Sequence, residues 1–467
     1  MKTQGDDIEP GEAAPYTPSH HGEILPVKES NYDPAFGEGG QDSPNYRSLG
    51  FFGTIVLMMK AQIGLGVLSI PYIFDSVAMI PGVLLICAVA SIATWTSYMV
   101  GVFKMKHPEV YGIDDAGGLM FGKIGREVLG AAFSLFMIFV SGSGILGMSI
   151  GLNAISSHAT CTAVFVVVCA AIGFLFASIR TLSRISWVAW VGLACILVSI
   201  LIVTISVGIQ DRPASAPQDD DWVPDYKLIE NPTFVQGATA VSSIIFACSA
   251  TPAYFGIAAE MRDRRYFTKS LIIAQIGSTL MYITIGVVVY YYCGSYVASP
   301  ALGSAGPLIK KIAYGISLPG LAATTTIYIH LPSKYVFVRL LRGSEHLSSN
   351  SLIHWATWLG CTFSVTLIAY LIASGIPFFD GVVSLIGALL GTFLAYQPSG
   401  CMWFYDNWSR RTERSWKWSV MACWSAFVIA VGTFITVAGT YASIVGIIEL
   451  LREDGGSKPW TCADNSI

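Results

Sequence analysis

Long apolar segments follow one another along almost the whole chain after residue 49, and they constrain the fold more than any other feature. A run of about 18 or more apolar residues is long enough to cross a lipid bilayer as a helix. Only 12% of the 467 residues are charged and the mean hydropathy is +0.59, whereas a soluble domain carries about 25% charge. The sequence predicts an all-α integral membrane protein with eleven transmembrane helices, at 50–74, 78–103, 128–155, 160–179, 184–209, 233–259, 269–293, 312–338, 352–374, 377–397 and 418–448.

Lysine and arginine residues are concentrated in one alternate set of the loops between these segments. That set contains seventeen of them: Lys104, Lys106, Lys123, Arg126, Arg180, Arg184, Arg262, Arg264, Arg265, Lys269, Lys334, Arg339, Arg342, Arg410, Arg411, Arg414 and Lys417. The other set, counted with the C-terminal residues, contains six: Arg212, Lys227, Lys310, Lys311, Arg452 and Lys458. Basic loops remain on the cytoplasmic side of a membrane. We therefore expect the N-terminus in the cytoplasm and, after eleven crossings, the C-terminus outside. The expected membrane is the plasma membrane, with the vacuolar membrane as the alternative.

Polar stretches divide the chain into segments of different character. The first 49 residues carry nine acidic and three basic side chains among many Pro, Gly and Ser residues, a composition that is typical of disorder. The predicted organisation is a cytoplasmic tail at 1–49, five helices at 50–209, an extracellular loop at 210–232, five further helices at 233–397, a cytoplasmic loop with the eleventh helix at 398–451, and a tail at 452–467.

Ten cysteines are spread along the chain, and no two have the CxxC spacing. We therefore expect no metal site, and most of the cysteines should be small buried apolar side chains. Cys161 and Cys293 both map to the outer ends of apolar segments, which makes them a candidate disulfide pair, although the sequence does not fix their distance. No cofactor is expected, and a net charge of only −3 argues against a nucleic-acid partner.

Two of the apolar segments contain residues that interrupt a helix. The first reads Lys60-Ala-Gln-Ile-Gly-Leu-Gly-Val-Leu-Ser-Ile-Pro-Tyr72, and the sixth reads Phe246-Ala-Cys-Ser-Ala-Thr-Pro-Ala-Tyr254. In the sixth, Thr251-Pro252 predicts a helix cap followed by a new half-helix. Either interruption alone is explained by a kink that neighbouring helices cover, but unwound backbone also occurs where it lines a cavity. Because the first and sixth segments open two groups of five with opposite orientation, the pattern predicts an inverted repeat whose substrate site lies between the two breaks.

The helix ends at these breaks have complementary polarity. The half-helix that follows Gly66 points its positive N-terminal end at the membrane centre, and the first half of the sixth segment points its negative carbonyl end there. A zwitterion fits this arrangement, and the apolar segments offer no obvious acidic partner for a cationic substrate. We therefore expect a neutral zwitterion with an aliphatic or aromatic side chain, for which the small residues at 247–250 leave room and Phe246 and Tyr254 form side walls. The expected binding residues are Ile63, Gly64, Leu65, Gly66 and Val67 for the carboxylate end, and Phe246, Ala247, Cys248, Ser249, Ala250 and Tyr254 for the rest.

These motifs resemble those of the amino acid/auxin permease family. The segment from Lys60 to Tyr72 resembles the first helix of that family, and the run Phe246…Tyr254…Ala259-Glu260-Met-Arg-Asp263…Phe267 resembles its sixth helix and the following loop. The resemblance extends over roughly residues 45–450 and is nearest to the neutral amino acid permeases of filamentous fungi. It implies a five-plus-five (LeuT-like) fold with broken helices 1 and 6. It also implies secondary active amino acid uptake, which is usually driven by protons in fungi.

The resemblance also draws attention to Lys60. In sodium-coupled relatives this position is an asparagine near a sodium site that also uses hydroxyl groups of the eighth helix, where this chain has Thr324, Thr325 and Thr326. We expect the Lys60 ammonium to replace the sodium ion, and a buried lysine can also release its proton and so carry the coupled proton. The alternative is a lysine whose stem runs along the helix to the membrane surface. His330 is a second proton candidate, although a hydrogen-bonded structural histidine is the commoner role.

Charged residues after the sixth segment and the lack of enzyme motifs bear on the mechanism and the class of protein. Glu260 lies close to Arg262, so we expect an ion pair at the inner gate that forms and breaks as the protein changes conformation. The sequence contains no P-loop, HExxH or GxSxG motif, and we expect no enzyme activity. The expected function is alternating-access symport of a neutral amino acid with protons. The alternatives are an amino acid sensor on a transporter fold and a vacuolar amino acid transporter.

Overall fold

The computed structural model describes residues 32–33, 37–38, 49–179, 185–210, 212–213, 216–217, 223–341, 344, 346, 351–409, 415–452 and 458–466. The chain forms two units, Met1–Pro44 and Asn45–Ile467. In the first, β1 (Tyr32–Asp33) pairs with β2 (Gly37–Glu38) in an antiparallel sheet. Apart from residue 49, the rest of the tail for which we expect disorder lies outside the described residues, as do residues 211, 214–215 and 218–222 of the acidic loop.

The second unit is almost entirely helical, and each predicted apolar segment coincides with a helix or an interrupted helix. The first half consists of α1 (Phe51–Gln62), η1 (Gly66–Ser69), α2 (Ile70–Val77), α3 (Met79–Lys106), α4 (Ile113–Ser156), α5 (Thr162–Ala177) and α6 (Ile185–Ile209). The second half consists of α7 (Phe234–Ala247), η3 (Thr251–Ala253), α8 (Tyr254–Glu260), η4 (Arg264–Tyr266), α9 (Phe267–Cys293), η5 (Gly294–Tyr296), η6 (Ala301–Ser304), α10 (Pro307–Leu340), α11 (Leu352–Gly375), α12 (Phe379–Ile386), the π-helical turn η8 (Gly387–Gly391), α13 (Thr392–Asn407) and α14 (Trp416–Arg452).

The length and composition of the helices give a number of membrane crossings. Within the described residues, nine helices are long and apolar enough to span a bilayer, and the bent pair formed by α1 and η1–α2 makes a tenth. The apolar helix α5 has only 16 residues. The expected eleven crossings thus correspond to helices in the structure, but the count of eleven is not confirmed.

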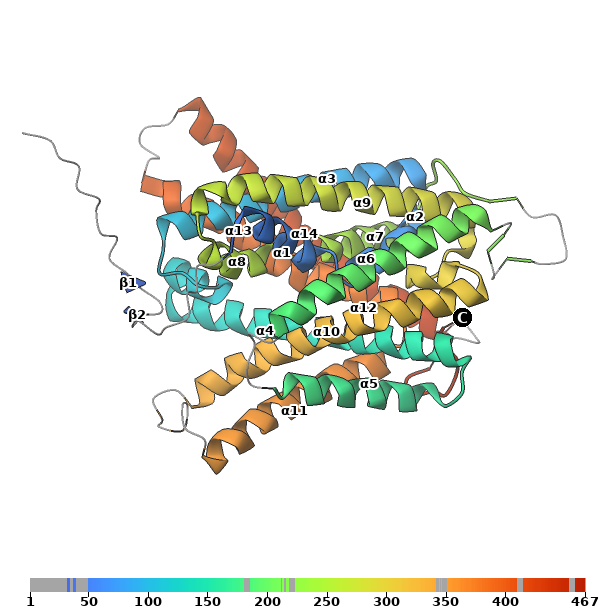
Figure 1. Cartoon of the computed structure of the whole chain (residues 1–467). Coiled ribbons are helices and arrows are strands. Elements are labelled where there is room, and N and C mark those ends of the chain that lie inside the picture. The colour runs from blue at the N-terminus through green and yellow to red at the C-terminus, as the bar shows by residue number, and fades with distance from the viewer. Residues whose placement is uncertain are drawn as a thin grey trace, which may run out of the picture. The chain divides into compact units, whose positions relative to one another are not determined.

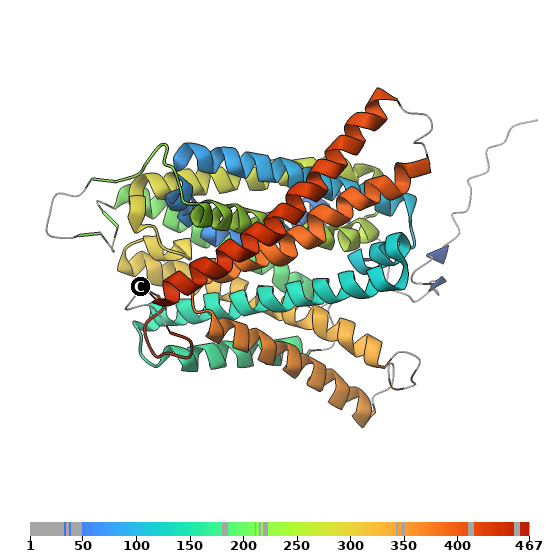
Figure 2. The same ribbon diagram turned by 180° about the vertical axis from the view of Figure 1, so that it is seen from behind.

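The helices pack side by side as one elongated bundle (Figures 1 and 2). α3 and α9 lie together along one side, α5 and α11 lie along the opposite side, and α10 packs against α4 and α6 between them. Large apolar side chains are exposed on the outer surface, such as Phe434 (64% exposed) and Val437 (70% exposed) on α14. Such side chains are favourable against lipid and costly in water, so the exposed surface is that of an integral membrane protein.

The two ends of the bundle are named here for the residues that lie there. The C-face carries the ends of α2, α4 and α14, at Val77, Ser156 and Arg452, together with the C-terminal residues 458–466. The N-face carries the start of α1 at Phe51 and the end of α8 at Glu260. The two interrupted helices run between these faces in opposite directions, so their breaks meet near the middle of the bundle.

Candidate functional site

The first transmembrane helix is interrupted between α1 and η1. α1 ends at Gln62, and the two halves of the helix are bent by 50° relative to one another. Among the described residues, the backbone N–H groups of Leu65, Gly66 and Val67 have no hydrogen-bond partner. Unpaired N–H groups at the start of a helix attract anions. The break therefore presents a set of donors suited to a carboxylate.

The sixth transmembrane helix is interrupted between α7 and α8. α7 ends at Ala247, and the short helix η3 precedes α8. The predicted cap by Thr251 is wrong, because η3 has no side-chain cap. The Thr251 hydroxyl instead lies 3.2 Å from that of Thr96 and 3.0 Å from that of Ser97, both on α3. The threonine thus anchors the broken segment to a neighbouring helix.

The two breaks touch one another. A Cβ atom added at Gly66 would lie 2.5 Å from the Cα of Ala247, closer than real Cβ contacts allow. The Tyr282 hydroxyl of α9 has one hydrogen, which it shares between the carbonyl oxygens of Gln62 (3.0 Å) and Ala247 (2.9 Å). The Gln62 oxygen also accepts from the Gly64 N–H (3.1 Å). A carbonyl at the end of each interrupted helix is therefore satisfied by the same side chain. This is how unwound backbone is tolerated inside a membrane protein.

A cavity of about 40 Å³ lies beside this contact. Of the predicted site residues, the lining includes Lys60, Gly64, Leu65, Gly66, Phe246, Ser249 and Thr324. The structure places the other predicted binding residues outside the lining: Ile63, Val67, Ala247, Cys248, Ala250 and Tyr254. No acidic side chain is among the described lining residues. The cavity therefore combines backbone donors, aromatic walls and one cation.

That cation is Lys60. Its Nζ donates a hydrogen bond to Oγ1 of Thr324 on α10 at 3.2 Å, and the Thr324 hydroxyl donates to the Gly320 carbonyl oxygen. The structure thus brings Lys60 to one of the three threonines expected near it. Thr325 donates to the carbonyl oxygen of Leu321 (2.9 Å), and neither it nor Thr326 lines the cavity. The ammonium is held where it can neutralise a substrate carboxylate or occupy the place of a metal cation.

His330 lies elsewhere on α10. Its Nδ1 is 3.0 Å from the carbonyl oxygen of Ala177, and its ring packs against Trp358 at 5.1 Å between ring centres. The imidazole is buried and does not line the cavity. The geometry favours the structural histidine that we considered as its alternative role.

Five further residues, none of them predicted, complete the lining of the 40 Å³ cavity: Ala61, Gln62, Phe136, Val140 and Tyr328. Phe136 and Val140 lie one turn apart on α4, so only the packing of α4 against the breaks reveals them. Gln62 could have been predicted from the sequence, since it is a polar residue in the middle of an apolar segment. Its amide is buried and lacks a hydrogen-bond partner in the described structure, which costs free energy unless a ligand or water satisfies it.

A larger cavity of about 700 Å³ opens at the N-face between α4 and α10. Phe133 and Leu331 line it, one turn along each helix from Phe136 and Tyr328 of the smaller cavity. Its rim carries both signs of charge, including an ion pair between Asp115 and Arg126 (2.5 Å). The two cavities lie in line along α4 and α10, as a path from the breaks to the N-face requires.

The expected inner-gate ion pair is absent from the described structure. The Glu260 and Arg262 side chains are exposed and form no salt bridge with each other. Their backbones instead hold Leu49: the Leu49 N–H donates to the Glu260 carbonyl oxygen (3.2 Å), and the Arg262 N–H donates to the Leu49 carbonyl oxygen (3.0 Å). The chain before the first helix is thus joined to the chain after the sixth.

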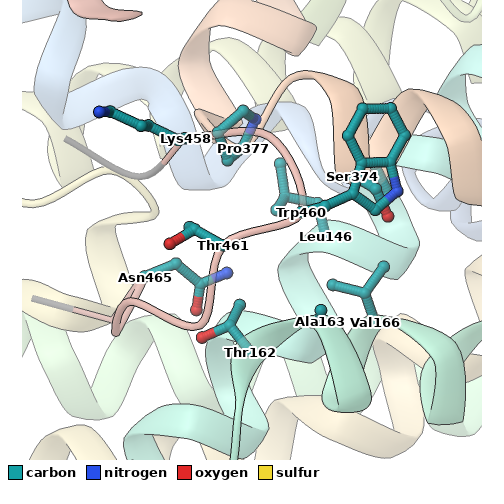
Figure 3. Close-up of a pocket in the computed structure, with 11 residues that line it drawn as sticks. Leu146, Thr162, Ala163, Val166, Ser374, Pro377, Lys458, Trp460, Thr461 and Asn465 are labelled. Carbon is teal, nitrogen blue, oxygen red and sulfur yellow. The ribbon is translucent and has the colours of Figure 1, made fainter.

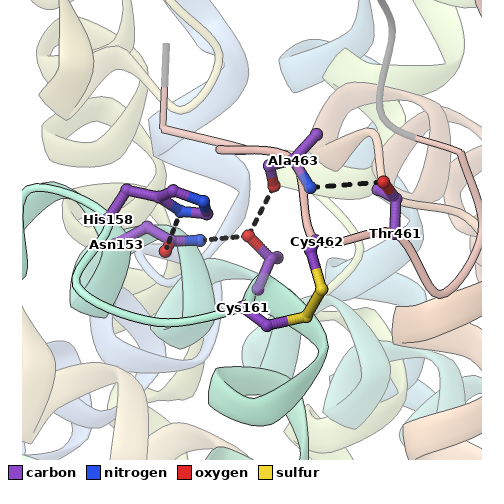
Figure 4. The surroundings of a disulfide bond; sticks show 7 residues. Asn153, His158, Cys161, Thr461, Cys462 and Ala463 are labelled. Carbon is purple, nitrogen blue, oxygen red and sulfur yellow. Dashed lines mark hydrogen bonds between the residues drawn. A yellow bond between two sulfur atoms is a disulfide. The ribbon is translucent and has the colours of Figure 1, made fainter.

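The disulfide expected between Cys161 and Cys293 is wrong. Cys161 is bonded to Cys462, and Cys293 is a free, buried thiol (Figure 4). The reason is the path of residues 458–466, which cross the C-face. The Thr162 hydroxyl donates to the Ala463 carbonyl oxygen (2.5 Å), which places Cys462 beside the start of α5. Cys462 lies in the polar C-terminal segment, outside the apolar segments from which the pair was predicted.

The same C-terminal residues close a small cavity of about 20 Å³ at the C-face (Figure 3). The backbone N–H of Trp460 donates to the Ser374 carbonyl oxygen (3.3 Å). The Asn465 side chain accepts from Asn153 (2.6 Å) and donates to Ser149 (3.3 Å), both on α4. The disulfide is therefore one of several bonds that fix this segment across α4, α5 and α11.

Comparison with known families identifies the chain. Residues 47–445 match the model of the family described as "Transmembrane amino acid transporter protein". The chain belongs to this family. It is 33% identical over 460 residues to a "Transmembrane transporter" of Gibberella moniliformis, with 97% of each chain covered. It is 32% identical over 436 residues to the "N amino acid transport system protein" of Neurospora crassa, with 91% of each chain covered.

Solved structures show the fold of this family member. Mhp1, a nucleobase-cation-symport-1 family transporter, superposes in a closed conformation with a TM-score of 0.56, 12% identity, and coverage of 94% of this chain and 98% of Mhp1. The inward-facing conformation of Mhp1 gives a TM-score of 0.55 at 13% identity, with 90% and 95% covered. At this identity the likeness concerns the fold alone. The chain is an integral membrane transporter with the five-plus-five fold that the sequence predicts.

Proposed function

We propose that this protein is a secondary active transporter that carries neutral aliphatic or aromatic amino acids by alternating access, together with protons. One observation supports this most strongly: the breaks of the first and sixth helices touch, through Gly66 and Ala247, beside a cavity that contains Lys60. In this fold, interrupted helices at corresponding positions of the two halves form substrate sites.

The recognition of the substrate follows from the unpaired groups at the breaks. The carboxylate binds the N–H groups of Leu65 and Gly66, at the positive end of a half-helix. The ammonium binds at the carbonyl end of α7, which has the opposite polarity. Phe136, Phe246 and Tyr328 form an apolar wall for the side chain. A cationic side chain would find no carboxylate among the described lining residues, which favours neutral amino acids.

The proposed coupling ion is the proton. The hydrogen bond from Lys60 to Thr324 supports a fixed positive charge beside the breaks, at the position that the family resemblance assigns to the sodium site of sodium-coupled relatives. A bound sodium ion beside this ammonium would be repelled strongly, since like charges a few ångströms apart cost several kcal/mol in a low-dielectric site, at about 4 kcal/mol for 4 Å and an effective dielectric constant of 20. We therefore propose sodium-independent transport.

The proposed orientation places the N-face in the cytoplasm and the C-face outside, in the plasma membrane. The loops at the N-face contain most of the lysine and arginine residues. The disulfide between Cys161 and Cys462 lies at the C-face, and disulfides persist in oxidising compartments. The 700 Å³ cavity at the N-face is then the proposed release path into the cytoplasm.

Uptake of radiolabelled leucine and phenylalanine in a transport-deficient yeast tests this function. The expected result is uptake that is independent of sodium, stronger at acidic than at neutral pH, and abolished by a protonophore. Growth of an amino acid auxotroph on limiting leucine gives a second readout. No uptake of any neutral amino acid, with the protein present at the cell surface, would contradict the proposal and favour a sensor, which binds but moves no substrate.

A further inference from the structure

A separate polar cavity of about 150 Å³ lies near the C-face, between α2, α7, α12 and α14. It is distinct from the substrate cavity, since no residue lines both. Its lining is rich in oxygen atoms, which come from Tyr72, Thr239, Asp380, Ser384, Ser443 and Glu449. None of the described residues that line it is a lysine, arginine or histidine. A cavity with two carboxylates and no base favours a positively charged occupant.

Asp380 is the carboxylate closest to the transport machinery. It lies in the first turn of α12 and accepts a hydrogen bond from the Ser243 hydroxyl of α7 at 3.2 Å. Ser243 lies one helical turn before Ala247, where α7 ends against Gly66. A change in the charge of Asp380 therefore alters its hydrogen bond to α7, the half-helix whose end forms the substrate site.

Unsatisfied polar groups lie around the same cavity. Ser443 of α14 is only 1% exposed, and its hydroxyl has no hydrogen-bond partner in the described structure. The buried Thr239 hydroxyl of α7 likewise has none. Buried hydroxyl groups are normally hydrogen-bonded, and exceptions call for an explanation such as a water or an ion. Two unpaired hydroxyls beside a carboxylate are suited to hold water, along which a proton can reach Asp380.

The groups that face Asp380 leave it without a neutralising partner. α14 contributes the carboxylate of Glu449, α2 contributes the phenol of Tyr72, and α7 contributes the neutral side chains of Gln236 and Ser243. α4 also packs against α12 but contributes no residue to the cavity. Apart from the helix N-terminus itself, no positive charge of the described lining offsets the carboxylate, so a cation from solution is the group that can do so.

We propose that this cavity is the entry site of the coupled proton and that Asp380 is the group that receives it. The inference rests on the proposed proton coupling and names the residue that performs it. A hydronium ion that reaches the cavity from the C-face transfers its proton to an Asp380 carboxylate oxygen and leaves as water. The carboxylate becomes a neutral carboxylic acid. The proton returns to water when the conformational change exposes Asp380 to the opposite side.

A structural role for Asp380 makes a different prediction. An acidic residue in the first turn of a helix stabilises that helix by interaction with its dipole. If this were its only role, its removal would lower stability and all transport modes together. The experiment must therefore separate proton-driven accumulation from substrate exchange, which moves amino acid in both directions and needs no net proton movement.

The test uses the full-length protein in liposomes and radiolabelled leucine, in sodium-free buffer. Wild type should show both leucine exchange and accumulation driven by an inward proton gradient. For Asp380→Asn we expect exchange within about twofold of wild type, less than the tenfold that corresponds to about 1.4 kcal/mol, and no proton-driven accumulation. Glu230→Gln is the matched control, because Glu230 is a carboxylate at the same face that pairs with Lys227 outside the cavity. It should retain both activities.

The outcomes distinguish this inference from the proposed function. If wild type shows no leucine exchange, the proposed function fails. If wild type is active and Asp380→Asn still accumulates leucine under a proton gradient, the inference about Asp380 is overturned. Loss of exchange in a correctly folded Asp380→Asn protein also overturns it, because the residue would then serve the substrate or the structure. A sodium gradient that drives wild-type but not Asp380→Asn accumulation would assign the cavity to sodium and not to protons.

Two conservative variants test the role of Asp380 as the proton acceptor if Asp380→Asn does not fold. Asp380→Glu keeps a carboxylate and should retain proton-driven accumulation. Ser243→Ala removes the hydrogen bond to Asp380 and should move the midpoint of the pH dependence upward, because the ionised carboxylate loses a donor. A pH profile of Ser243→Ala identical to that of wild type, with unchanged leucine exchange, would contradict the assignment.

Discussion

At the scale of single residues, the site depends on two residues of the first transmembrane helix, a glycine and a lysine. Gly66 has no side chain, and this lets its backbone touch that of Ala247. Lys60 has a long charged one, which reaches Thr324 across the cavity. The glycine brings the two breaks together, and the lysine sets the charge of the space beside them.

Substitution of Gly66 by alanine should separate the two breaks. The added Cβ would meet the Ala247 Cα at 2.5 Å, and overpacking of this kind costs about 1–3 kcal/mol. We expect leucine uptake to fall roughly tenfold or more, since about 1.4 kcal/mol corresponds to a factor of ten. Gly256→Ala is the control, because a Cβ there meets no atom within 4 Å. Equal uptake by the two variants, at equal surface expression, would argue against close contact as a requirement.

Replacement of Lys60 by asparagine tests its role as a fixed cation. The variant removes the charge that donates to Thr324 and introduces the residue type found in sodium-coupled relatives. We expect either a loss of uptake or the appearance of sodium dependence, because the site then lacks its cation. Uptake of labelled leucine with and without sodium is the measurement. Normal, sodium-insensitive uptake by Lys60→Asn would show that the lysine has no such role.

At the scale of elements, the interrupted helices are stabilised by intact helices around them. α9 supplies Tyr282, whose hydroxyl bonds a carbonyl oxygen from each break. α3 supplies Thr96 and Ser97 to Thr251 at the second break. Unwound backbone is thus stabilised by polar side chains of its neighbours, and the cost of each break is limited to the groups that face the cavity.

Loss of the Tyr282 hydroxyl should therefore destabilise the protein. Tyr282→Phe leaves the buried carbonyl oxygen of Ala247 without a donor, which costs about 1–3 kcal/mol. The carbonyl oxygen of Gln62 keeps the Gly64 N–H as a donor. Thermal unfolding of the purified protein in detergent, followed by a thiol-reactive dye, should show a lower midpoint. Tyr396→Phe is the matched control, because Tyr396 is buried but its hydroxyl has no partner in the described structure. The account is contradicted if both variants unfold at the wild-type temperature.

At the scale of the whole molecule, the C-terminal residues connect distant helices at the C-face. The disulfide joins Cys161 and Cys462 across 301 residues of sequence, and the Asn465 side chain reaches α4. This segment lies over α4 and α5, so a thiol there reports which side of the membrane the C-face occupies. The orientation of the entire protein can therefore be measured at this single site.

Removal of Cys161 should make the Cys462 thiol available for labelling. In Cys161→Ser the thiol of Cys462 becomes free, and a membrane-impermeant maleimide should label it in intact cells if the C-face is outside. The same variant should unfold at a lower temperature, because a disulfide typically contributes about 2–4 kcal/mol. Cys423→Ser is the control, since Cys423 is not part of a disulfide. Labelling of Cys462 only after the cells are permeabilised would reverse the proposed orientation.

The sequence was most informative where a pattern is local. The positions of the apolar helices and of both breaks follow from runs of apolar residues and from the glycine- and proline-containing motifs at 60–72 and 246–254. The approach of Lys60 to Thr324 came from family resemblance and not from spacing. Contacts between helices were not predictable, because they depend on packing: Phe136 and Tyr282 carry no local signal, and the partner of Cys161 lies in a polar tail that returns to the bundle.

The most direct test of the central claim is a coupled flux measurement on the purified protein. Liposomes that contain the transporter, an internal pH-sensitive dye and sodium-free buffer are given an inward proton gradient and labelled leucine. The account predicts that leucine accumulates above its external concentration and that its entry accelerates the acidification of the interior. Leucine entry without proton movement, or proton movement unaffected by leucine, would contradict coupled amino acid transport.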